Sequence, residues 1–200
     1  MFILNTRFQI AALCFFVVIV FDYIRSKKLP LLSTKLFSAM IVFVGLNLCF
    51  DIVTVYTVNG IVEVTPSMNR FFHQIFIGTL EIIIVLLYLY VEILGHNQKR
   101  MNIGKLLISM IPFAGSLIMV AYGKLYYHTG VHTSYSYGTM AISLFFVIAF
   151  YMILIILNTY LYKDVLRKEK RTGIRRGVMI WMMAAVIQYF NPELLISGVA

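Results

Sequence analysis

The sequence predicts an all-α protein, a polytopic bundle of transmembrane helices. Of the 200 residues, 61% are hydrophobic and only 12% are charged, with a mean hydropathy of +0.89, whereas soluble domains are about half apolar and a quarter charged. The apolar residues form long continuous runs such as 82–91 (IIIVLLYLYV), which lack the alternation of barrel strands. Because hydrocarbon offers the backbone no water to bond, such runs must be helical.

Six apolar stretches define the expected spans, since one span needs roughly 20 apolar residues. The first lacks the basic start and small-residue cleavage site of a signal peptide, so we expect a retained helix. No repeat or linker divides the chain, which predicts a single membrane-embedded domain over residues 1–200. The six stretches are Phe8–Ile24, Leu36–Val58, Phe71–Leu94, Leu106–Tyr122, Thr139–Tyr162 and Gly177–Phe190.

A seventh apolar stretch starts at Glu193 and reaches the last residue, Ala200. This stretch is too short to cross a bilayer. It therefore predicts a truncated seventh helix, and a chain that stops short of a following segment.

Lysine and arginine are distributed unevenly between the expected loops. All but three of the seventeen fall in the segments after the first, third and fifth stretches, and the three exceptions are Arg7, Arg70 and Lys124. Cationic loops stay in the cytoplasm. The pattern therefore predicts a multi-pass plasma-membrane protein whose N-terminus lies outside.

The chain carries no motif of known chemistry. It has no P-loop, no nucleophile elbow, no zinc-protease motif and no dinucleotide fingerprint. Cys14 and Cys49 lie inside apolar runs and lack metal-ligand spacing. The net charge of +9 follows membrane topology and lacks the interleaved aromatics of nucleic-acid binding. We expect no catalytic residue, no metal, no cofactor and no nucleic-acid partner, with the lipid bilayer as the surroundings.

Polar residues inside the spans are the candidate functional groups, because such residues face the bundle interior. Asn47, Asp51 and Thr54 share one helix face. In the third span a polar stripe recurs at alternating intervals of four and three residues. Two interpretations stay open: an outward-facing cavity for a small extracytoplasmic ligand or cation, or hydrogen bonds between helices. The candidate sensing residues are Asn47, Asp51, His73, Gln74, Glu81 and Tyr88.

Three further polar residues are candidate helix–helix contacts: Glu92, Asn158 and Gln188. His73 is either a pH sensor or a structural residue. Of the outer loops, 59–70 and 123–138, the second is rich in tyrosine, which is typical of an interfacial belt or of a small cap.

The inner loop after the fifth stretch is strongly basic. It fixes topology and is able to attract anionic lipid headgroups. Its cations are Lys163, Arg167, Lys168, Lys170, Arg171, Arg175 and Arg176.

Several segments together resemble a known sensory module. They are Leu46–Asn59 (LNLCFDIVTVYTVN), Met68–Leu80 (MNRFFHQIFIGTL), Leu87–Ile93 (LYLYVEI), the tyrosines before Gly138 and Ile187–Ser197 (IQYFNPELLIS). This set is similar to the N-terminal membrane module of bacterial, chiefly clostridial, GGDEF-type diguanylate cyclases, to which modules preceding histidine kinase domains are related.

The resemblance implies a signal-transducing sensor whose last helix leads into a cytoplasmic enzyme domain that dimerises to make cyclic di-GMP. This sequence holds no Gly-Gly-Asp-Glu-Phe motif, so enzyme activity is not expected of this chain itself. The alternatives are a small transporter or permease, because intramembrane acids suit cation coupling, and a membrane scaffold subunit.

Overall fold

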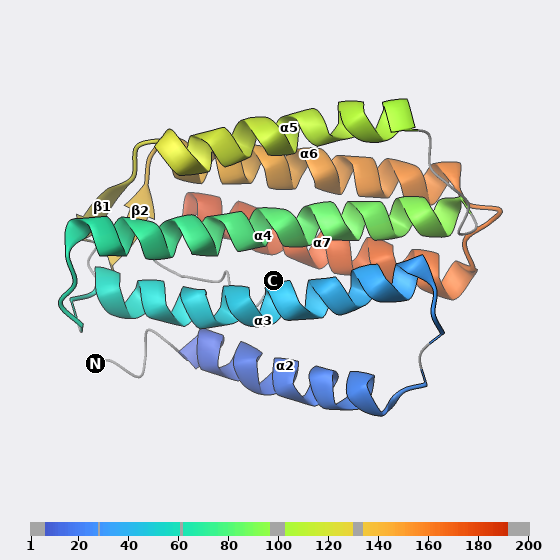
Figure 1. Cartoon of the computed structure of the whole chain (residues 1–200), viewed down its shortest axis with the longest axis horizontal. Coiled ribbons are helices and arrows are strands. Elements are labelled where there is room, and N and C mark those ends of the chain that lie inside the picture. The colour runs from blue at the N-terminus through green and yellow to red at the C-terminus, as the bar shows by residue number, and fades with distance from the viewer. Residues whose placement is uncertain (1–6, 28, 61, 97–102, 130–133, 192–200) are drawn as a thin grey trace.

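The computed structural model describes residues 7–27, 29–60, 62–96, 103–129 and 134–191, with side chains from Gln9 onward. Six helices lie side by side along the long axis of the described part of the chain, and their connections alternate between its two ends (Figure 1). The helices are α2 (Arg7–Arg25), α3 (Leu32–Val58), α4 (Pro66–Gly95), α5 (Ile103–Tyr122), α6 (Thr139–Leu161) and α7 (Lys168–Phe190).

Four of these helices, α3 to α6, are long and apolar enough to cross a membrane. The prediction of six spans is therefore wrong for Phe8–Ile24 and Gly177–Phe190. In α2 the described apolar stretch is bounded by Gln9 and Asp22, and the cations that open α7 leave a short apolar remainder. Both stretches fall below the roughly 20 residues that a span needs. The predicted seventh helix lies outside the described residues.

Helix α4 is the centre of the bundle. It begins at Pro66 after Thr65, whose hydroxyl accepts a hydrogen bond from the Met68 backbone N–H at 3.3 Å, a common N-cap arrangement. It packs against α3, α5 and α6. Its buried side chains, with those of α6, form the core cluster around Ile84 and Tyr151.

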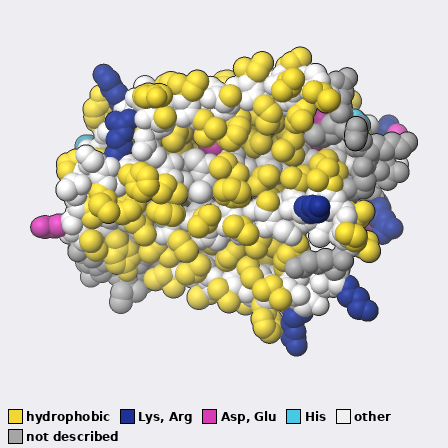
Figure 2. All heavy atoms as spheres, in the orientation of Figure 1, with side chains coloured by type: hydrophobic (Ala, Val, Ile, Leu, Met, Phe, Trp, Pro, Cys, Tyr) yellow, Lys and Arg dark blue, Asp and Glu magenta, His cyan; other side chains and the backbone are white. Residues whose placement is uncertain are grey.

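A hydrophobic band covers the middle of the visible face, and charged side chains gather near the ends (Figure 2). Large apolar residues such as Phe15, Ile108 and Phe146 are exposed on the helices, as expected of side chains that face lipid. Most of the described cations lie in the connections before α3 and after α6 or in the neighbouring parts of α2, α3 and α7, and Arg70 and Lys124 lie at the opposite end. We call these the cationic end and the hairpin end.

The hairpin end carries two short strands that the sequence analysis did not predict. Strand β1 (Tyr126–Thr129) pairs antiparallel with β2 (Ser134–Tyr137), and Tyr126 lies opposite Tyr137. Gly138 then leads into α6 with a φ of 129°, a conformation that glycine adopts without strain. The hairpin thus joins α5 to α6 and covers part of this end of the bundle.

Candidate functional site

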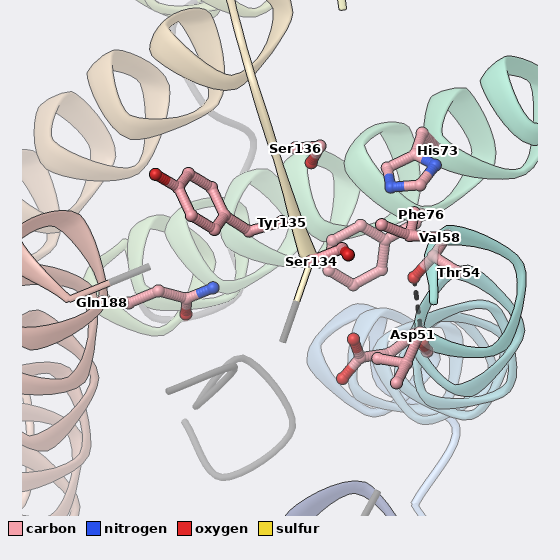
Figure 3. Close-up of a pocket in the computed structure, with 10 residues that line it drawn as sticks. Asp51, Thr54, Val58, His73, Phe76, Ser134, Tyr135, Ser136 and Gln188 are labelled. Atoms are coloured by element: carbon pink, nitrogen blue, oxygen red, sulfur yellow. Dashed lines mark hydrogen bonds between the residues drawn. The ribbon is translucent and has the colours of Figure 1, made fainter. Parts of the chain in front are cut away.

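A small polar pocket of about 70 Å³ lies at the hairpin end, where α3, α4, β2 and α7 meet (Figure 3). Space of this size holds a few water-sized groups. The lining residues are Asp51, Thr54, Val55, Val58, His73, Phe76, Ser134, Tyr135, Ser136 and Gln188.

Helix α3 contributes the acid of the pocket. Asp51 is buried and is the only charged residue in this described lining. The Thr54 hydroxyl donates to the Asp51 backbone carbonyl at 2.8 Å. The Asp51 carboxylate points toward the pocket, as Figure 3 shows. A buried carboxylate among hydroxyl and amide groups suits a small ligand that donates hydrogen bonds or carries positive charge.

Helix α4 contributes His73, which is also buried. Its Nδ1 lies 3.0 Å from the Asn69 carbonyl oxygen, so Nδ1 must carry the hydrogen and Nε2 is the acceptor of the neutral ring. The ring contacts Tyr127 of β1 edge-on, with centroids 5.3 Å apart. Burial raises the pKa of the Tyr127 hydroxyl, so it remains protonated at neutral pH.

The last two walls come from β2 and α7. The Ser134 backbone N–H donates to Asn59 Oδ1 at 3.0 Å, which fastens β2 to the end of α3. Gln188 enters from the opposite side, on the last turns of α7 (Figure 3). A ligand in this pocket therefore contacts three different helices and the hairpin at once.

Two predicted sensing residues instead join helices. Asn47 donates to the Phe76 carbonyl at 2.8 Å and to Thr79 Oγ1 at 2.9 Å, linking α3 to α4. Gln74 donates to the Val120 carbonyl at 3.0 Å, linking α4 to the end of α5. For these two residues the contacts favour the interhelical interpretation.

Glu81 lies midway along α4 and is 0% exposed. Its Oε1 accepts a hydrogen bond from Ser116 of α5, while Oε2 has no hydrogen-bond partner among the described residues. Glu81 does not line the polar pocket. It is a separate buried acid between α4 and α5.

A second polar cluster lies at the cationic end around Glu92, which is 2% exposed. Its carboxylate forms an ion pair with Lys105 of α5 and accepts a hydrogen bond of 2.8 Å from Tyr162, which follows α6. Burial raises the pKa of the Tyr162 hydroxyl, and its bond to Glu92 adds to the effect, so Tyr162 stays a donor. Three segments are thus joined, as expected for a helix–helix contact.

Tyr88 belongs to this inner region rather than to the pocket. Its hydroxyl lies 3.4 Å from Glu92 Oε1, and its ring lies 5.4 Å from that of Tyr151. Asn158 is buried, with its side-chain nitrogen unpartnered among the described residues. Gln188, expected at a helix contact, lines the pocket.

The basic inner loop is partly fixed by its own contacts. Arg175 donates to Thr159 Oγ1 at 2.8 Å, and its guanidinium lies 3.7 Å from the Tyr160 ring centroid. Arg171 donates to the Lys163 carbonyl at 3.0 Å. Arg175 therefore anchors the start of α7 to α6.

The sequence analysis missed two parts of these clusters. The β2 segment 134–137 (SYSY) alternates serine with tyrosine, which is a strand signal, whereas the sequence analysis predicts an interfacial belt or a small cap here. Lys105 was counted for topology alone, although it opens a span and is 47% exposed beside a buried acid. Among the described residues no three His, Cys, Asp or Glu side chains gather into a metal site.

No protein-family model, no curated protein and no solved structure matches this chain.

Proposed function

We propose that this chain is a membrane-embedded sensory input module, in which the polar pocket at the hairpin end binds a small extracytoplasmic ligand. The observation that carries the proposal is that α7 supplies Gln188 to a pocket otherwise built by α3, α4 and β2. A ligand that bridges Asp51 and Gln188 favours one position of α7 over another, and such differential binding is what shifts a two-state equilibrium.

The weak anchoring of α7 supports this role. Val178 is the one buried residue among the described side chains of this helix, and elements with few buried contacts are those that move at low energetic cost. Displacement of α7 at the pocket would be passed to whatever segment follows Phe190.

The proposed orientation places the cationic end in the cytoplasm and the hairpin end outside, following the positive-inside rule. On the resemblance to sensor modules, the membrane is a bacterial plasma membrane. The segment after this chain would then carry a cytoplasmic output domain, a diguanylate cyclase that dimerises and makes cyclic di-GMP.

The first test is to read the gene past codon 200 and to measure the output in cells. We expect a GGDEF or histidine kinase domain. We also expect Asp51→Asn and Gln188→Leu in the full-length protein each to change output several-fold at equal membrane abundance. A gene without an output domain, or two variants with unchanged output, would overturn the proposal.

Matched controls come from exposed positions outside the pocket on the same two helices. Val42 of α3 and Val186 of α7 are exposed, so Val42→Leu and Val186→Leu should leave output as in the wild type. If the controls change output as much as the pocket variants, the effect belongs to general packing.

A small transporter is the second candidate, favoured by Glu81. A buried carboxyl near the middle of a span, with one oxygen unpartnered among the described residues, suits transient proton or cation binding. Uptake by proteoliposomes that is abolished by Glu81→Gln and retained by Asp51→Asn would favour this function over the sensor.

A further inference from the structure

A further polar cavity lies at the other end of the bundle. It has a volume of about 330 Å³ and is open where α2 ends, α3 begins and α7 begins. Its lining residues are Tyr23, Ser26, Lys27, Leu29, Leu31, Ser33, Thr34, Phe37, Tyr90 and Lys170.

The charged residues in the described lining of this cavity are both cations. Lys27 comes from the α2–α3 connection and Lys170 from the first turn of α7, so two cations far apart in the sequence border one space. The described lining contains no carboxylate, and Thr34 adds a hydroxyl, whereas the Ser26 hydroxyl donates to the Tyr23 carbonyl at 2.8 Å. This chemistry selects an anion, and phosphate oxygens accept from ammonium and hydroxyl groups alike.

The remaining lining is apolar and aromatic. The Tyr23 and Phe37 rings lie 5.3 Å apart and the Phe37 and Tyr90 rings 6.1 Å apart, so α2, α3 and α4 each give one ring to a continuous row. The Tyr23 hydroxyl is held by Ser38 Oγ at 2.5 Å. Leu29 and Leu31 are exposed beside this row.

A cavity lined both by lysines and by apolar and aromatic side chains matches an amphipathic ligand rather than a free ion. In the bilayer, the ends of the spans lie at the level of the headgroups, where Lys and Arg attract anionic lipids. We infer that this cavity binds the phosphate of an anionic phospholipid, with Lys27 and Lys170 on the phosphate and the Tyr23–Phe37–Tyr90 row against the glycerol and upper acyl chain. The lipid would bridge the α2–α3 connection to the start of α7.

The test compares lipid binding by matched lysine variants of the full chain in uncharged detergent. Native mass spectrometry and thermal melting are followed as phosphatidylglycerol or phosphatidylcholine is added. Since a lysine near an anionic surface contributes roughly fivefold to affinity, Lys27→Gln with Lys170→Gln should weaken phosphatidylglycerol binding by about 30-fold. Phosphatidylcholine should bind the wild type and this variant equally.

The control variant is Lys163→Gln with Lys168→Gln, which removes the same charge from the same end outside the cavity lining. It should retain phosphatidylglycerol binding within about twofold of the wild type. Equal loss in both double variants would show diffuse attraction to the basic face and overturn the site. If millimolar inorganic phosphate raises the melting temperature as much as the lipid does, the site binds free phosphate and the proposal of a lipid is wrong.

Discussion

Helices α4 and α7 differ sharply in how they are held, although both belong to one bundle. Helix α4 has twelve buried residues and joins its neighbours through Asn47, Gln74, Glu81 and Glu92 contacts. Helix α7 has one buried residue, Val178, and its Arg175 side chain bonds to α6 near the start of the helix. The far end of α7 nevertheless supplies Gln188 to the pocket. The contrast indicates a rigid centre beside one element that a small ligand is able to displace.

The largest expected difference in stability is between shortening an isoleucine in α4 and shortening an isoleucine in α7. Ile84 of α4 is 0% exposed and Ile180 of α7 is 62% exposed. We expect Ile84→Ala to lower the free energy of unfolding by about 3 kcal/mol through a cavity in the core, and Ile180→Ala to change it by less than about 0.5 kcal/mol. Unfolding by dodecyl sulfate in mixed micelles, followed by circular dichroism, measures both. Similar values would contradict the contrast.

A second pair of variants tests the close packing at the cationic end of α4. A Cβ at Gly95 would overlap the Tyr162 ring, whereas a Cβ at Gly78 meets no atom within 4 Å. Gly95→Ala should therefore destabilise the bundle by about 2 kcal/mol, as overpacking does. Gly78→Ala should be neutral or stabilise by up to about 1 kcal/mol. The same unfolding assay decides, and a neutral Gly95→Ala would show that Tyr162 moves aside freely.

The hydrogen bond between Tyr162 and Glu92 gives a smaller effect. Tyr162→Phe removes the hydroxyl and leaves the ion pair of Glu92 with Lys105, so we expect a loss of about 1.5 kcal/mol, typical of a hydrogen bond to a charged group. Tyr160→Phe is the control, because Tyr160 is exposed. Equal losses of stability in Tyr162→Phe and Tyr160→Phe would show that the hydrogen bond to Glu92 does not help to join the segments.

The smallest global effect is expected at the anchor of α7. Arg175→Gln breaks the bonds to Thr159 and the stacking on Tyr160, with a loss of about 1 kcal/mol or less. Amide hydrogen exchange should nevertheless speed up throughout α7 and stay unchanged in α4. Uniform acceleration in both helices would indicate that the two unfold together.

Much of this architecture follows from hydrophobicity alone. The runs that became α3 to α6 have no alternative to helix in lipid, and their boundaries in the sequence lie close to those of the structure. The prediction counted two weaker apolar runs as spans. An apolar run alone does not indicate where its helix begins, and α7 begins early enough to include charged residues such as Arg175 and Arg176.

The site was harder to predict because proximity between distant segments is not a local property. The sequence identified Asp51 and His73 as polar residues of adjacent helices, and both line the pocket. Nothing in the spacing of α3 indicated that Gln188 and Ser136 would meet them, since that depends on how the hairpin and α7 fold back. Likewise, the pairing of Glu92 with Lys105 depends on packing between α4 and α5.

Helices α4 and α5 differ in length, and this difference determines how the protein fits a bilayer of a given thickness. Helix α5 has 20 residues and α4 has 30, which correspond to about 30 Å and about 45 Å of helix. A hydrocarbon layer of about 30 Å matches α5, so α4 must tilt or extend beyond it at its ends. Its last turn, which includes Glu92, then lies at headgroup depth, where the half-exposed Lys105 that pairs with Glu92 reaches water. A change in bilayer thickness is therefore expected to affect both the polar pocket and the Glu92 cluster, which include residues from opposite halves of α4.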